Sequence, residues 1–123
     1  MNIWESHQIE EKIREVLQDE YKGDHHFGNP LMTAFQIAIG ICKRYPDLLV
    51  NIDMQIGGEG VDKSFARYLA NQLSKRIKNG TISDIEGFSI SGKYIREIDF
   101  SDHEHVEREA NIGSEFSAFR LKG

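Results

Sequence analysis

The chain has 123 residues, of which 39% are hydrophobic and 28% charged, and its formal net charge is −5 at pH 7. This length and composition fit one globular domain over residues 1–123, and the negative charge argues against broad nucleic-acid binding. No stretch reaches the ~18 apolar residues that cross a bilayer, so no membrane partner is expected. Residues 1–5 lack the features of a signal peptide, and we expect a cytoplasmic protein.

Two helices are predicted before residue 46. The first has Ser6 as its N-cap and continues for about fifteen residues with one apolar stripe. The second follows Asn29-Pro30, spans 31–45, and is apolar on nearly all sides, which predicts a central buried helix. Gly40 in its interior costs about 1 kcal/mol relative to alanine, so we expect another element to cross closely there.

A strand is predicted over residues 48–56. Apolar and polar side chains alternate along its second half, the period of a half-buried strand: Val50, Ile52, Met54 and Ile56 against Asn51, Asp53 and Gln55. The sequence Gly57-Gly58-Glu59-Gly60 ends it, because glycine allows positive φ angles. A helix over 63–78 follows, with Asp62 as its expected N-cap and Asn79-Gly80 as its end.

The C-terminal third predicts strands. Residues 85–90 and 93–100 read as a hairpin around Ser91-Gly92, residues 101–115 as a loop or a weak helix, and residues 116–121 as a last strand. The order α-α-β-α-β-β, with a further β at the end, predicts an α+β or small α/β fold with three helices on a three- to four-stranded sheet. If strand 48–56 neighbours the strand near 84–90, the helix between them forms a right-handed parallel crossover.

The glycine turn is the candidate binding site, with Gly57, Gly58, Gly60, Lys63 and Ser64 as the residues that would hold an anion. Backbone N–H groups at a helix N-terminus attract phosphate, and a lysine can reach its oxygens. Residues 57–64 resemble the Walker A loop of P-loop nucleotide hydrolases in the spacing of their first glycine, lysine and serine. Asp62 stands where that motif has glycine, and as an N-cap it would occupy the helix-terminal donors, so we expect the site to be empty.

Two histidine clusters are candidate parts of a metal site. His25 and His26 form the first, and His103 and His105 the second. Neither has the spacing that identifies a zinc or iron site, and the two would have to meet in space to give a full ligand set. The sequence therefore predicts no metal site and no cofactor. Cys42 lies in an apolar run and is expected to be a buried thiol.

Two classes of function remain. The first is an acidic protein without catalysis that acts by macromolecular interaction, as a bacterial-type regulatory, immunity or phage-encoded accessory protein would. The second is a small-ligand-binding protein or enzyme that uses the 57–64 turn as a phosphate or nucleotide site. We also predict a homodimer, since three or four strands with apolar side chains on both faces are more than three helices can cover.

Overall fold

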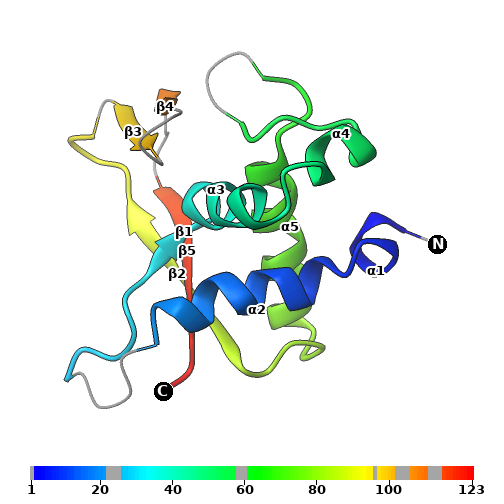
Figure 1. Cartoon of the computed structure of the whole chain (residues 1–123). Coiled ribbons are helices and arrows are strands. Elements are labelled where there is room, and N and C mark those ends of the chain that lie inside the picture. The colour runs from blue at the N-terminus through cyan, green and yellow to red at the C-terminus, as the bar shows by residue number, and fades with distance from the viewer. Residues whose placement is uncertain (1, 22–25, 58–60, 96, 102–105, 111–114) are drawn as a thin grey trace.

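A layer of helices packs against one face of an antiparallel sheet (Figure 1). The computed structural model describes residues 2–21, 26–57, 61–95, 97–101, 106–110 and 115–123. Its helices are α1 (Ile3–Ser6), α2 (Ile9–Asp19), α3 (Ala34–Arg44), α4 (Leu48–Ile52) and α5 (Phe65–Lys78). Its strands are β1 (Met32–Thr33), β2 (Ile85–Ser91), β3 (Glu97–Ser101), β4 (Val106–Ala110) and β5 (Glu115–Leu121). The predicted α+β class is confirmed.

β5 is the central strand of a three-stranded sheet with the order β1-β5-β2. Both neighbours run antiparallel to it, and Phe119 pairs with Met32 on one side and with Gly87 on the other. The strands predicted over 85–90 and 116–121 are confirmed as β2 and β5. β3 and β4 form a separate two-stranded antiparallel sheet, which reaches the helical layer where Phe100 stacks on Phe35 with ring centroids 4.8 Å apart.

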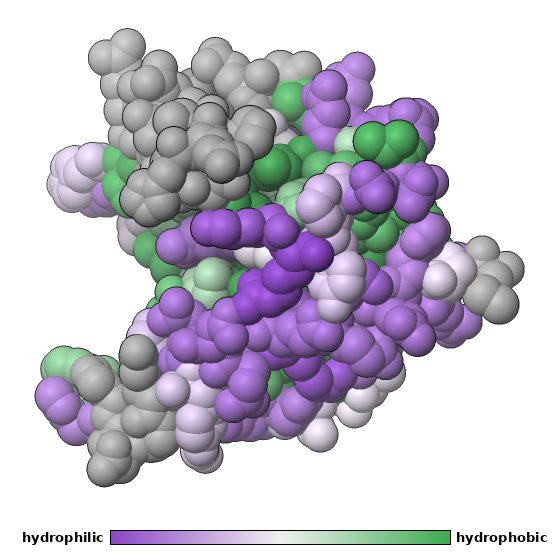
Figure 2. All heavy atoms as spheres, viewed as in Figure 1, coloured by the Kyte–Doolittle hydropathy of each residue, from purple (hydrophilic) through white to green (hydrophobic). Residues whose placement is uncertain are grey.

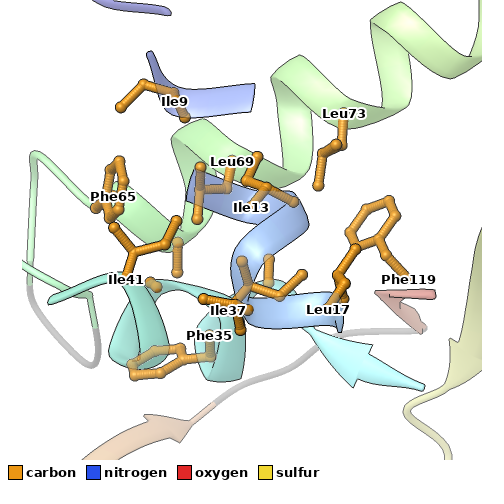
Figure 3. Packing of buried hydrophobic residues seen from close by; sticks show 14 of the residues in the cluster. Ile9, Ile13, Leu17, Phe35, Ile37, Ile41, Phe65, Leu69, Leu73 and Phe119 are labelled. Atoms are coloured by element: carbon orange, nitrogen blue, oxygen red, sulfur yellow. The ribbon is translucent and has the colours of Figure 1, made fainter. Parts of the chain in front are cut away.

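The core lies between the sheet and the three longest of the described helices (Figure 3). Its largest side chains repeat at helical spacing along each helix and meet the sheet at β5: Ile9, Ile13 and Leu17 from α2, Ile37 and Ile41 from α3, Phe65, Leu69 and Leu73 from α5, and Phe119. α3 contacts both α2 and α5, as expected of a central helix. A Cβ added at Gly40 would lie 2.8 Å from Val16 Cγ1, so the predicted close crossing is confirmed, and α2 makes it.

The strand predicted over residues 48–56 is wrong. Residues Leu48–Ile52 form the short helix α4, which Asp53 ends in the left-handed conformation with φ 55°. Leu48 and Ile52 are buried one helical turn apart, whereas Val50, which a strand would bury beside Ile52, is 82% exposed. The parallel crossover to the strand near 84–90 is therefore absent, and only an isolated parallel bridge joins Gln55 to Ser64.

Two of the predicted helix starts are also wrong. Ser6 is the last residue of α1, and α2 begins two residues beyond His7, after Gln8 takes a left-handed φ of 51°. α3 begins at Ala34 and not at residue 31, because Thr33 and Gln36 form a reciprocal capping box. Asn29 is buried and its side-chain Nδ2 donates to the Leu121 carbonyl at 2.8 Å, so it attaches its loop to the end of β5.

The hairpin predicted around Ser91-Gly92 does not form. β2 pairs with β5, and the chain turns after it, with Tyr94 at a left-handed φ of 68° and the Ile95 amide donating to the Gly92 carbonyl at 3.1 Å. This turn interrupts the strand predicted over 93–100, which begins only at β3. β3 instead pairs with β4, and β4 lies inside the stretch 101–115, for which we expected a loop or a weak helix.

Candidate functional site

The glycine turn connects α4 to α5, and its two ends lie side by side. The Gln55 amide donates to the Lys63 carbonyl at 3.0 Å. In return, the Phe65 amide donates to the Gln55 carbonyl at 2.8 Å, and the Ala66 amide to the Ile56 carbonyl at 2.9 Å. The chain that enters the turn therefore runs along the first residues of α5.

These bonds determine what the N-terminus of α5 can offer an anion. A helix leaves its first amide groups without partners inside the helix. In α5 the Phe65 and Ala66 amides are bonded to residues 55–56, and the Arg67 amide donates to the Ser64 Oγ at 3.0 Å. Ser64 is thus the N-cap, and the expectation that Asp62 fills this role is wrong. The α5 amides that would bind phosphate are occupied by acceptors of the protein itself.

Lys63 lies beside the turn but is paired. Its Nζ is 2.7 Å from Asp53 Oδ2, an ion pair on the surface of the molecule. The hydrogen bond and charge of Lys63 lower the pKa of Asp53, and Asp53 in turn raises the pKa of Lys63. Both groups are strongly exposed, so water and salt screen the pair. The lysine is therefore accessible to an anion, which would compete with a carboxylate of this chain.

A hollow of about 650 Å³ adjoins this ion pair. Its walls combine apolar side chains, those of Leu49, Val50, Met54 and Val61, with three charged ones, those of Asp53, Asp62 and Lys63, and the amide of Gln55. Three positions carry carboxylate or amide oxygens and one carries an ammonium, so the lining does not favour a highly charged phosphate. A small ligand with both apolar and zwitterionic character fits this chemistry better.

Gly57 is the one candidate glycine that the structure describes, because Gly58 and Gly60 lie outside the described residues. Gly57 is buried at φ 146°, a conformation that L side chains rarely adopt. An added Cβ would lie 2.8 Å from the Ser64 Oγ and 3.2 Å from Phe35 Cε2. Glycine is needed here so that the turn can pass between the α5 cap and the core.

Of the four histidines that were candidate metal ligands, the structure describes His26 alone. His25, His103 and His105 lie outside the described residues, and His26 is exposed with its ring centroid 4.1 Å from that of Phe27. Within the described ranges, no group of three or more His, Cys, Asp or Glu side chains could hold a metal ion.

A second feature, which the sequence interpretation missed, is the outer edge of β2. This seven-residue strand pairs only with β5 in the described part of the sheet, so its other side is an edge. Natural edge strands are usually protected by lysine, proline or a bulge. β2 has the sequence Ile-Glu-Gly-Phe-Ser-Ile-Ser, with neither of those residues and an unbroken register against β5. The signal was present in residues 87–91, which carry no charge, but the predicted hairpin paired this strand with residues 93–100 and so left no free edge there.

The outer face of the sheet, opposite the helices, carries apolar side chains. Ile85 and Phe119 point into the core, so the alternate residues of β2 and β5 point outward. These include Phe88, which is 39% exposed, and the partly exposed Ile90 and Phe116. By contrast, hydrophilic residues dominate the surface over α2 (Figure 2).

Arg120 organises one end of this outer face. Its Nε donates to Glu86 Oε2 at 2.8 Å, and its Nη1 donates to the carbonyls of Phe27 at 2.8 Å and Asn29 at 3.2 Å. The guanidinium carbon also lies 4.9 Å from the centre of the Phe88 ring. The single charge of β2, that of Glu86, is therefore compensated within the chain.

None of the described helices combines the length and the apolar character needed to cross a membrane. No protein-family model, no curated protein and no solved structure matches this chain.

Proposed function

We propose that this protein acts by binding another protein through the edge and outer face of β2, and that its first partner is a second copy of itself. It would then be a cytoplasmic protein of the regulatory, immunity or accessory type, without catalysis. The observation that carries this proposal is the unprotected edge of β2 beside the exposed Phe88. An open strand edge with a neighbouring apolar side chain is a template for pairing with another chain.

The exposed area of the Phe88 side chain gives the expected effect on the dimer dissociation constant. An exposed fraction of 39% on a side chain of about 200 Å² leaves roughly 80 Å² of this ring in water. If a dimer covers half of that area on each copy, about 80 Å² is buried in total, worth ~2 kcal/mol at ~25 cal/mol/Å². Removing both rings should then raise the dimer dissociation constant roughly 30-fold.

The test is light scattering coupled to size exclusion at tens of micromolar, on the wild type, Phe88→Ser and Tyr94→Ser. Tyr94 is the matched control, because it is an aromatic residue that is 94% exposed and lies beyond the end of β2. We expect a dimer for the wild type and for Tyr94→Ser. On dilution, the Phe88→Ser dimer should dissociate at a higher protein concentration than either of them. A wild-type monomer under these conditions would exclude the homodimer.

The alternative function is binding of a small ligand beside the glycine turn, at Gly57, Gly58, Gly60, Lys63 and Ser64. The hollow of about 650 Å³ next to Lys63 supports it, and the occupied amides of α5 weigh against a phosphate ligand. Thermal-shift screening with phosphate, nucleotides and zwitterionic metabolites tests this alternative, since a saturable rise in Tm that Lys63→Ala removes would favour it.

A further inference from the structure

We infer that the dimer proposed above forms by antiparallel pairing of β2 with β2 of the second copy, with the two-fold axis at Ser89. This inference rests on the proposed function and adds the geometry of its interface. The result is a continuous six-stranded sheet with the order β1-β5-β2-β2-β5-β1. The register follows from three properties of β2.

The first property is the direction of the backbone groups. In an antiparallel pair, residues that exchange hydrogen bonds with one neighbour alternate with residues whose N–H and C=O point to the other side. The Lys122 amide donates to the Asp84 carbonyl at 2.9 Å, and these two residues continue the β2–β5 register. The even-numbered residues of β2 therefore bond to β5, and the odd-numbered ones direct their N–H and C=O groups to the free edge.

The second property is accessibility along this edge. Ile85 is 0% exposed, so its backbone cannot be reached by another strand. Gly87, Ser89 and Ser91 are exposed, and within the described ranges no backbone hydrogen bond outside the β2–β5 ladder involves Gly87 or Ser89. Three accessible residues centred on Ser89 can pair with the same three residues of a second copy. Gly87 then faces Ser91 of that copy, and the two Ser89 residues face each other.

The third property is the match of side chains on the outer face. With the axis at Ser89, Phe88 of each copy lies opposite Ile90 of the other, and aromatic–β-branched pairs stabilise neighbouring strands. An axis at Phe88 would instead place the Glu86 carboxylate opposite Ile90. The Ser89 register is therefore favoured by both the backbone and the side chains.

A second copy suits this edge because the paired segment carries no uncompensated charge. The overall charge of −5 makes two copies repel each other in general. In β2, however, the only charged side chain is Glu86, which bonds to Arg120 of its own chain. The paired segment therefore adds little to this repulsion.

Disulfide trapping in the full-length protein tests the register. Residues opposite each other in a hydrogen-bonded pair have Cα atoms about 5.5 Å apart, within the ~4.4–6.8 Å that a disulfide spans. We expect Ser89→Cys to form a reducible covalent dimer under mild oxidation at least ten times faster than Ser91→Cys or the wild type. Ser91→Cys is the matched control, because its two copies would be separated by four residues, roughly 13 Å along the strand.

The outcomes separate this inference from the proposed function. A wild-type dimer in which Ser91→Cys or Phe88→Cys crosslinks as fast as Ser89→Cys would overturn the register and leave the dimer standing. A wild-type dimer in which none of the three crosslinks would place the interface away from β2 and also overturn the inference. A wild-type monomer at tens of micromolar would reject the homodimer and the register together.

Discussion

Substitution of Gly57 by alanine should destabilise the protein by ~2–4 kcal/mol. The first contribution is conformational, since φ 146° is outside the range of ordinary L residues and such backbone strain costs ~1–3 kcal/mol. The second is steric, because the added Cβ would lie 2.8 Å from the Ser64 Oγ and 3.2 Å from the Phe35 ring. Overpacking of this kind costs ~1–3 kcal/mol, and displacing Ser64 also weakens the N-cap of α5.

Two other glycines separate these contributions. Gly80 has φ 83° with nothing within 4 Å of an added Cβ, so Gly80→Ala should show the conformational cost alone, about 1 kcal/mol. Gly87 has no positive φ, but its Cβ would lie 3.1 Å from the Phe119 ring, so Gly87→Ala should show mainly the steric cost. Urea unfolding followed by circular dichroism gives the three free-energy differences. If Gly57→Ala costs no more than Gly80→Ala, the close contacts at Gly57 add nothing to the conformational cost, which would refute the steric contribution.

Three further predictions concern the core, pH and ligands. Phe35→Ala should lose ~3–5 kcal/mol in urea unfolding, and Ile39→Ala clearly less, because Phe35 is buried whereas Ile39 is only partly so; equal losses would contradict this packing. Arg14 lowers the pKa of Asp84, so their ion pair stabilises the fold above the ordinary pKa of ~4 and is lost as the pH falls through the lowered value. Asp84→Asn should therefore cost under ~1 kcal/mol at pH 7 and progressively less as the pH falls below ~4, which unfolding at a series of pH values checks. Phosphate and ATP at millimolar concentration should leave Tm unchanged in the wild type and in Lys63→Ala, whereas a saturable rise confined to the wild type would establish an anion site.

The sequence predicted the helices and strands whose periodicity allows one interpretation. α5 and β5 lie within two residues of their expected bounds, because each has an apolar pattern of a single period between clear end signals. The prediction of a strand over residues 48–56 failed because the apolar positions 48, 52 and 56 fit both a two-residue and a four-residue repeat. Val50 and Met54 distinguish the two repeats, and the 82% exposure of Val50 is visible in the structure alone.

The candidate site was predictable in its residues but not in its bonding. Gly57 and Lys63 lie beside the start of α5, as expected, but the partners of the α5 amides come from residues 55–56. No local sequence pattern predicts that residues 55–56 run along the start of α5. Likewise, the edge of β2 depends on β5 lying on its other side, a pairing between segments about 30 residues apart. Tertiary contacts of this kind determine which groups remain available for binding.

The central position of β5 has a consequence for vectorial folding. In the described sheet β1 and β2 lie on opposite sides of β5, which comes after both of them in the chain. During synthesis the helices α2, α3 and α5 can associate early, but neither β1 nor β2 can form its ladder with β5 until β5 leaves the ribosome. Until then the core also lacks Phe119, and the nascent chain exposes the apolar surface that this ring later covers. Completion of the sheet is thus a late step, and a translational pause before residue 115 would prolong the lifetime of an aggregation-prone intermediate.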